Sequence, residues 1–255
     1  MSVGFIHGVM NTDNMAISGE TIDYGPCAFM DNYDTNTVFS SIDHAGRYAY
    51  GNQPAIAQWN LARFAETLLP LIDPDIGKAV ELATAVVRDF MPRFDALLLT
   101  RMRRKIGLAS EMESDVELVR TLLGTMQSAG ADFSLTFRRL ARCADEPAND
   151  DSLLELFAPS SGIADWLRRW RERLASEPQN AAERAVNMRR VNPAFIPRNH
   201  RVEAALEAAS THGDFAPFHR LLKILEHPYD DQPGCGEFER PPAPGERVLR
   251  TFCGT

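Results

Sequence analysis

Apolar residues recur every three or four positions after residue 53, which is the spacing of one face of an α-helix. In the first such stretch these residues are Ile56, Trp59, Leu61, Phe64, Leu68 and Leu71. Pro54 suits the first turn of a helix, and Pro70 and Pro74 close it. The pattern therefore predicts a helix from Pro54 to Ile72 that is buried on a broad face.

The same spacing predicts further helices along the rest of the chain. One runs from about residue 76 to 106, with a kink or break at Pro92, and ends at Gly107. The next begins at a capping box, Ser114–Glu117, and stops at Gly130. The others cover residues 134–143, 152–157, 163–174, 181–190, 202–209 and 215–225. Because no basic groove accompanies Trp166 and Trp170, we expect them in the core, not as a platform for stacking bases.

The first 51 residues have a different pattern of short apolar pieces and turns. Met15–Ile17 and Glu20–Asp23 are separated by a turn that contains a glycine, which predicts a small β-hairpin. Such a hairpin brings Asn14, before its first strand, close to Asp23, at the end of its second. One amide oxygen and one carboxylate suit Mg²⁺, which keeps waters and takes further oxygens from nucleotide phosphates. Asp13 would remain available as a base.

This distribution of roles is typical of kinase-type phosphoryl transfer. There, one Asp lies near the attacking hydroxyl, while an Asn and a second Asp hold the metal. The residues alone do not separate phosphoryl transfer from the transfer of another part of a nucleotide.

Four longer stretches of the chain resemble one family. They are His7–Asp31, Gly46–Leu61, Asn192–Glu203 and Phe252–Thr255. Together they look like the selenoprotein O family of protein adenylyltransferases. The resemblance implies a protein-kinase-like fold that transfers AMP from ATP to Ser, Thr or Tyr hydroxyls of protein substrates, with ATP as substrate and Mg²⁺ or Mn²⁺ as cofactor.

The resemblance also implies roles for individual residues. Asp13 would be the catalytic base. Asn14 and Asp23 would be the metal ligands, and Asp23 would also lie near the ATP phosphates. In this family the position of Cys253 carries a redox residue that pairs with a cysteine near the active-site loop. Residues 38–41 offer no cysteine for that pair, and Cys27 is the only nearby substitute. We do not favour a Cys27–Cys253 bridge.

The chain departs from the family in its length. Family members carry a glycine-rich phosphate loop, a nucleotide-contacting Lys and its Glu partner before the part that matches here. The glycines of this chain form no such loop pattern. We therefore expect a C-terminal half that needs a missing N-terminal lobe as partner, binds Mg-ATP weakly alone and is inactive by itself.

Composition limits the classes of function. The chain has 255 residues, of which 44% are hydrophobic, and a net charge of -8, which argues against a general nucleic-acid binder. The basic run Arg101–Lys105 more simply complements the C-terminal dipole of its helix on a solvated face. No stretch is apolar enough to cross a membrane and the N-terminus lacks the features of a signal peptide, so we expect the cytoplasm and no membrane partner.

Other polar residues have alternative interpretations. A group of polar residues precedes a helix, namely Arg198, Asn199 and His200. These residues either reach a substrate or cap the helix and hold a loop in place, and we favour the structural role. Arg47 either steadies its loop, meets a phosphate or pairs with Asp43. Four cysteines do not make a disulfide framework, and Cys143 on a helix is expected to be packed.

These observations combine into one fold prediction. The chain is mainly α, a protein-kinase-like C-lobe with a small β-hairpin that carries the metal site, followed by a helical extension. Within a single body, residues 1–51 form catalytic and metal-binding loops, 52–227 a helical lobe and 228–255 an extended Pro/Gly-rich tail. The alternatives to an adenylyltransferase are a truncated remnant or interaction module without activity and, third, a kinase-type phosphotransferase.

Overall fold

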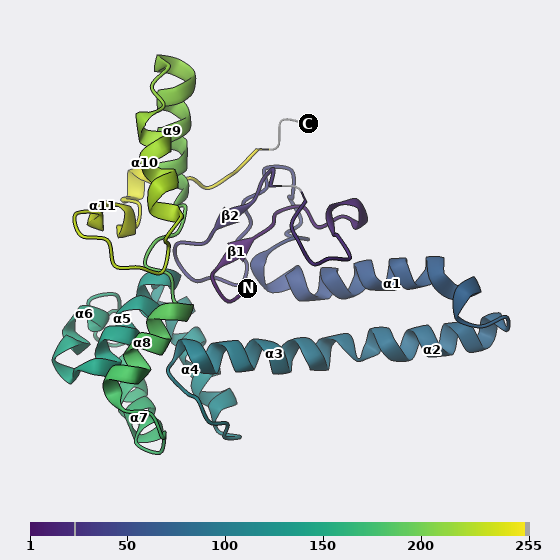
Figure 1. The fold of residues 1–255 in the computed structure, drawn as a ribbon, viewed down its shortest axis with the longest axis horizontal. Coiled ribbons are helices and arrows are strands. Elements are labelled where there is room, and N and C mark those ends of the chain that lie inside the picture. The colour runs from purple at the N-terminus through teal and green to yellow at the C-terminus, as the bar shows by residue number, and fades with distance from the viewer. Residues whose placement is uncertain (23, 253–255) are drawn as a thin grey trace. The chain divides into compact units, whose positions relative to one another are not determined.

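The fold is mainly helical, as predicted (Figure 1). The computed structural model describes residues 1–22 and 24–252, without the side chain of Pro147. Two short strands, β1 (Phe5–Ile6) and β2 (Ala28–Phe29), form a two-stranded sheet.

Eleven α-helices are assigned within the described residues. They are α1 (Gln53–Ile72), α2 (Ile76–Arg88), α3 (Phe90–Lys105), α4 (Asp115–Ala129), α5 (Phe133–Asp145), α6 (Asp150–Leu154), α7 (Ile163–Leu174), α8 (Ala181–Val191), α9 (Asn199–His212), α10 (Ala216–Leu225) and α11 (Gly236–Glu239). Short 3₁₀ turns are η1 (Thr12–Asn14), η2 (Tyr50–Asn52), η3 (Pro147–Asn149) and η4 (Pro244–Glu246).

The contacts divide the chain into two compact units. Unit 1 comprises Met1–Phe5, Phe29–Asp34 and Leu99–Val248, and unit 2 comprises the described residues of Ile6–Ala28, Thr35–Leu98 and Leu249–Thr255. Each unit is assembled from segments that are far apart in the sequence, and each is described by itself.

Two tryptophans of α7 form the centre of unit 1. Trp166 and Trp170 are buried and stacked, with ring centroids 5.8 Å apart. Each indole N–H donates a 2.8 Å hydrogen bond to a backbone carbonyl, of Leu118 and Ile106 respectively. A buried indole satisfied in this way is part of the core, which confirms the prediction for both residues.

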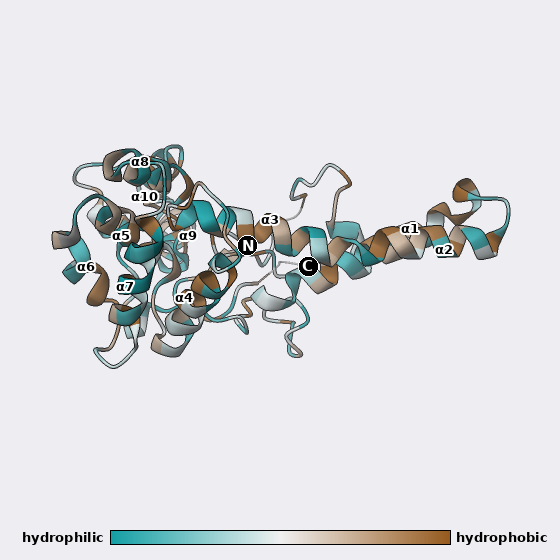
Figure 2. Cartoon of the chain, turned by 90° about the horizontal axis from the view of Figure 1, so that it is seen from below, coloured by the Kyte–Doolittle hydropathy of each residue, from teal (hydrophilic) through white to brown (hydrophobic). Residues whose placement is uncertain are grey.

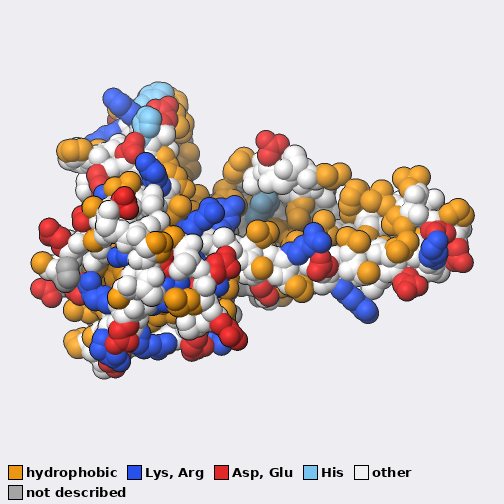
Figure 3. Space-filling view, turned by 60° about the horizontal axis from the view of Figure 1, so that its bottom comes forward, with side chains coloured by type: hydrophobic (Ala, Val, Ile, Leu, Met, Phe, Trp, Pro, Cys, Tyr) orange, Lys and Arg blue, Asp and Glu red, His pale blue; other side chains and the backbone are white. Residues whose placement is uncertain are grey.

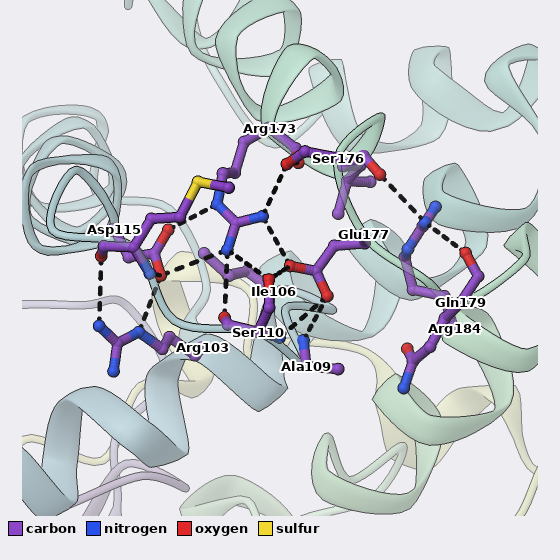
Figure 4. Close-up of polar contacts among 12 residues, drawn as sticks. Arg103, Ile106, Ala109, Ser110, Asp115, Arg173, Ser176, Glu177, Gln179 and Arg184 are labelled. Atoms are coloured by element: carbon purple, nitrogen blue, oxygen red, sulfur yellow. Dashed lines mark hydrogen bonds and ion pairs between the residues drawn. The ribbon is translucent and has the colours of Figure 1, made fainter.

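A network of buried charges joins α3, α4 and α7 in unit 1 (Figure 4). The Asp115 carboxylate accepts hydrogen bonds from Arg103 at 2.9 Å and Arg173 at 2.7 Å. Arg173 also donates to Glu177 at 2.6 Å, and Glu177 accepts the backbone N–H of Ala109 at 2.7 Å. Burial alone would raise the pKa of Asp115, but the hydrogen bonds from Arg173, the Met112 N–H and Arg103 lower it below its usual value.

Two predictions for this region were wrong, the capping box at Ser114 and the solvated basic run. Ser114 makes no capping hydrogen bond, and Asp115 accepts the Met112 N–H instead, at 2.8 Å. The Glu117 side chain bonds residues within α4, so the predicted capping box was wrong. The basic run 101–105 is also not a solvated face throughout, because Arg103 and Lys105 are buried.

The predicted break in the long second helix is confirmed. α2 ends at Arg88 and α3 begins at Phe90, two residues before Pro92, where the ring is tolerated because first-turn N–H groups lack helical partners. Gly107 follows α3 with a φ of +80°, a conformation that favours glycine.

The helix predicted from Pro54 to Ile72 forms as α1, but its burial was predicted wrongly. Only Gln53, Pro54 and Asn60 are buried in α1, and the apolar side chains of its stripe are exposed or half-buried. α1 packs along α2, with the Gln58 side chain donating to the Val87 carbonyl at 3.0 Å. Figure 2 colours many residues along this helix pair as hydrophobic.

The C-terminal segment is less irregular than predicted. It contains α11, whose Phe238 is buried in unit 1 beside Phe195 and Leu221. Further on, Thr251 joins unit 2, where its backbone N–H donates to the Phe39 carbonyl at 2.7 Å and its hydroxyl to the Pro26 carbonyl at 2.5 Å.

Candidate functional site

The candidate catalytic loop of unit 2 ends in the 3₁₀ turn η1. The Asn14 side-chain Nδ2 donates to the Val9 carbonyl at 3.3 Å, and the Asn14 backbone N–H donates to the Asn11 carbonyl at 3.0 Å. Because a carbonyl can only accept, this contact fixes the amide with Nδ2 toward Val9. Oδ1 accepts no hydrogen bond from a described residue, so Asn14 offers an oxygen of the kind that Mg²⁺ takes.

Asp13 precedes Asn14 and is exposed. Its carboxylate forms no hydrogen bond or ion pair with any described residue, so it is accessible to a substrate hydroxyl. Asp23 lies outside the described residues. Its predicted roles as metal ligand and ATP contact therefore stay predictions, as does its convergence with Asn14 on one ion.

The hairpin predicted around these residues is not formed in the described part. Residues 15–22 contain no strand, and the chain turns through a hydrogen bond from the Gly19 N–H to the Ala16 carbonyl at 3.0 Å. Ile17 is 86% exposed. A short isolated hairpin is not stable without a packed face. The strands that pair are β1 and β2, in which Ile6 and Ala28 are buried.

Two polar residues of α1 hold the candidate catalytic loop in place. The Gln53 side chain accepts the His7 backbone N–H at 3.0 Å, and the Asn60 side chain donates to the Met10 carbonyl at 2.9 Å. Gln53 and Asn60 are two helical turns apart and therefore lie on one face of α1. Their buried amides fix both ends of the segment that leads into η1.

Tyr48 supports the same loop from the segment before α1. Its hydroxyl donates to the Asn11 side chain at 2.5 Å. Asp43 fixes the backbone there by accepting the N–H groups of Arg47 and Tyr48, both at 2.8 Å. The Arg47 guanidinium lies 4.9 Å from the Trp59 ring centroid, so the alternative of an Arg47–Asp43 salt bridge is not what the structure shows.

A pocket of about 320 Å³ opens beside the loop within unit 2. Residues that line it include Thr12, Met15, Ile17, Asn60, Leu61 and Phe64. The pocket is bounded by both neighbours of the Asp13–Asn14 pair, so a group placed in it lies next to η1.

Sequence reasoning missed Gln53, Asn60 and Tyr48 as positioning residues. The sequence did contain a sign of this role. Gln53 and Asn60 are polar residues seven positions apart on a helix that was predicted from its apolar residues. Such spacing places them together on one face, although it does not identify the backbone groups they contact.

Arg198 has the structural role that the sequence favoured. It is buried in unit 1, where it bonds Asp31 at 2.5 Å and Asp132 at 2.8 Å. Burial raises the pKa of Asp31, and Arg198 opposes that shift. His200 is buried as well, which lowers its pKa. The Arg198 ion pairs connect the start of α9 to Asp31 and Asp132 of unit 1.

The cysteine predictions are tested only in part. Cys143 is buried, which confirms the prediction that it is packed, and burial raises its pKa to about 12. Cys253 lies outside the described residues, so its redox role stays a prediction and the disfavoured bridge to Cys27 is not tested. In the described part of the chain no three His, Cys, Asp or Glu side chains gather as a metal site, and no helix there is long and apolar enough to cross a membrane.

Comparison with known proteins identifies the family of this site. The family described as "Protein adenylyltransferase SelO" matches residues 1–226, which include the whole loop, η1 and α1. The chain belongs to the SelO family of protein adenylyltransferases. The resemblance seen in the sequence is thereby confirmed.

Curated relatives match the chain from end to end. A "Protein nucleotidyltransferase YdiU" of Rhizobium leguminosarum bv. trifolii is 61% identical over 255 residues, which is 100% of this chain and 51% of the relative. The protein of the same name from Rhizobium meliloti is 58% identical over 100% of this chain and 52% of its own length. That of Rhodopseudomonas palustris is 56% identical over 99% and 51%. The chain spans about half the length of the curated relatives it matches.

Proposed function

We propose that this chain provides the catalytic and metal-binding loop of an ATP- and Mg²⁺-dependent protein adenylyltransferase. The observation that carries the proposal is the geometry of η1: an accessible Asp13 carboxylate lies directly beside an Asn14 amide whose oxygen is left for a metal. Membership of the SelO family favours AMP as the transferred group. We expect the reaction in the cytoplasm.

Each residue has a chemical role in this proposal. Asp13 accepts the proton of a Ser, Thr or Tyr hydroxyl on a protein substrate as the hydroxyl oxygen forms a bond to the α-phosphorus of ATP. The bond from that phosphorus to the bridging oxygen breaks, and pyrophosphate leaves. Asn14 and Asp23 would hold Mg²⁺, with Mn²⁺ as the alternative, and Asp23 would lie near the phosphates. When bound, the ion neutralises the charge that develops on the phosphate oxygens.

The proposal includes a second half of polypeptide. The chain spans about half of its relatives, and it has no glycine-rich loop pattern to cradle phosphates. A Mg²⁺ ion held by one amide and one carboxylate keeps most of its ligands as water and binds loosely. We therefore expect the chain alone to bind Mg-ATP weakly and to transfer no AMP.

The test is reconstitution. Calorimetric titration of the chain alone with Mg-ATP is expected to show no tight binding. Co-expression with the remaining half of the Rhizobium leguminosarum relative is expected to give AMP transfer to protein, which intact-mass analysis separates from phosphate transfer. Asp13→Asn is expected to lower the rate at least about 100-fold, while Glu20→Gln, an exposed acid of the same segment, serves as the matched control.

Other outcomes decide among the alternatives. A phosphate-sized mass increase would make the protein a kinase-type phosphotransferase. Assembly of the two halves without any transfer would favour an interaction module, for which the exposed apolar side chains of α1 and α2 are the supporting observation. Equal rates for Asp13→Asn and the control would refute the role of Asp13.

A further inference from the structure

A groove lies along the helix pair α1 and α2 within unit 2. We call it the apolar groove. Its volume is about 920 Å³. Residues that line it include Leu61, Phe64 and Leu68 of α1, Leu82 and Val86 of α2, and Phe90 of α3. Of the lining residues only Asp89 and Arg93 are charged, so the groove suits an apolar partner.

The side chains of the apolar groove are strongly exposed. Val86 is 74% exposed, Leu82 47% and Phe64 41%. Figure 3 shows hydrophobic side chains gathered on the surface of this helix pair. Exposed apolar side chains gathered in one groove are typical of a surface where another chain packs.

The apolar groove adjoins the pocket beside η1. Leu61 and Phe64 line both, and the other walls of the pocket include Thr12 and Met15. A polypeptide that fills the groove therefore packs against the same α1 side chains that border the pocket beside η1. This is where the proposed function requires the half that holds the nucleotide.

The curated relatives contain the length of chain that such an occupant needs. About half of each relative lies outside the part that matches this chain. We propose that the apolar groove of α1 and α2 is the docking surface for that other half of the SelO polypeptide. A second copy of this chain would bring no nucleotide-binding part to η1, so we favour the other half as the occupant.

The inference deepens the proposed function, on which it rests for the identity of the partner. Its test measures assembly without nucleotide. Failure of the halves to assemble and failure of an assembled pair to transfer AMP are therefore separate results.

The first experiment compares two double variants in co-purification. The chain is co-expressed with the remaining half of the Rhizobium leguminosarum relative, tagged on that half only. L82E/V86E places two charges in the apolar groove. The control, L71E/I76E, places two charges at exposed apolar positions of the same helices that do not line the groove.

We expect the wild-type chain and the control to co-purify with the tagged half as a 1:1 complex. L82E/V86E should bind that half at least about 100-fold more weakly, because burying unpaired charges in an interface is strongly unfavourable. Equal binding by both variants would overturn the proposal, as would a wild-type chain that does not co-purify. A wild-type chain that forms dimers, and loses them only in L82E/V86E, would also overturn it by assigning the groove to a second copy.

The second experiment does not depend on the folding of charged variants or of an isolated half. A cysteine is placed at Val86 or at Leu71, in this chain and at the aligned positions of the full-length relative. Maleimide labelling is then followed by peptide mapping. We expect Val86→Cys to react in this chain and to be protected at least about 10-fold in the full-length protein, with Leu71→Cys reactive in both. Equal labelling of Val86→Cys in the two proteins contradicts the inference.

Discussion

Lys105 provides a sharp test of the packing in unit 1, because the side chain is 2% exposed. Its ammonium donates to the Asn192 side chain at 2.6 Å and lies 4.2 Å from the Phe137 ring centroid. No carboxylate forms an ion pair with it among the described residues. Burial lowers the pKa of Lys105 from 10.5 to about 7.

The sign of the effect on stability follows from proton binding in the two states. Between pH 7 and 10.5 the unfolded chain holds a proton on Lys105 that the folded chain has released. The contribution of Lys105 to the free energy of unfolding therefore rises with pH in this window, by about 1.4 kcal/mol per pH unit and about 5 kcal/mol in total. Lys105→Met removes the titrating group, so we expect it to stabilise the protein at neutral pH and abolish the slope.

Other groups with a shifted pKa define the window of measurement. Burial lowers the pKa of the Met1 amino group from 8.0, which adds a slope of the same sign below pH 8. The raised pKa of Cys143 makes stability fall above pH 9, since only the unfolded thiol releases its proton there. Between pH 8 and 9 the slope of unit 1 therefore comes from Lys105, and it corresponds to a rise in Tm of about 3–5 °C.

The assay is thermal unfolding followed by tryptophan fluorescence. In a Trp59→Phe background only Trp166 and Trp170 report, and both belong to unit 1. Lys223→Met, at an exposed lysine of α10, is the matched control and should keep the slope of the parent. The reasoning is refuted if Lys105→Met keeps that slope too, or if Tm of the parent does not rise from pH 8 to pH 9.

Three further substitutions test other parts of the structure. Asp115→Asn leaves its two arginine partners without their buried carboxylate and should lower the free energy of unfolding in urea by about 3–5 kcal/mol. Because the pKa of Asp115 is lowered in the folded state, this difference should shrink as pH falls through that pKa. A difference below about 1 kcal/mol at neutral pH would contradict the network. Gly107→Ala places a Cβ 2.8 Å from the sulfur of Met188 at a positive φ, and should lower unfolding free energy by at least about 2 kcal/mol in the same assay. Asn60→Ala should release the segment before η1 and lower kcat for AMP transfer by the assembled halves about 10- to 100-fold. The control Gln58→Ala should keep a kcat near that of the parent. A parent-like kcat for Asn60→Ala would exclude a positioning role.

The helices were the part of the fold that sequence predicted best. α7 begins and ends at the predicted residues, Ile163 and Leu174, and the break before Pro92 was also found. These features depend on local chemistry, namely apolar spacing and the backbone limits of proline. Local chemistry is read directly from neighbouring positions in the chain.

The contacts that fix the units are not local, which is why they were missed. Arg198 meets Asp31 across 167 positions, and Arg173 meets Asp115 across 58. A lysine or arginine is solvated by default, so Arg103 was expected to be exposed. A buried acid partner reverses that expectation, and sequence alone does not place the partner.

For the candidate site, the sequence placed Asp13 and Asn14 in one loop but did not predict what supports that loop. Asp13 and Asn14 are adjacent, so their placement in one loop needed no tertiary contact. The support of that loop by Gln53 and Asn60 depends on the packing of α1 against residues 7–10. The hairpin failed because apolar alternation over three residues does not specify a strand without a partner surface.

A comparison of α1 with α7 shows what an apolar stripe does and does not determine. Both helices carry one, and in α7 it is covered: Trp166 and Trp170 are buried within unit 1. In α1 the stripe was expected to be buried on the same grounds, yet Phe64 and its neighbours line an open groove. Periodicity predicts that a helix face will be covered, because exposing it to water is unfavourable. It does not say which polypeptide covers that face, and for α1 the proposed polypeptide is the half of the relatives that lies outside the match to this chain.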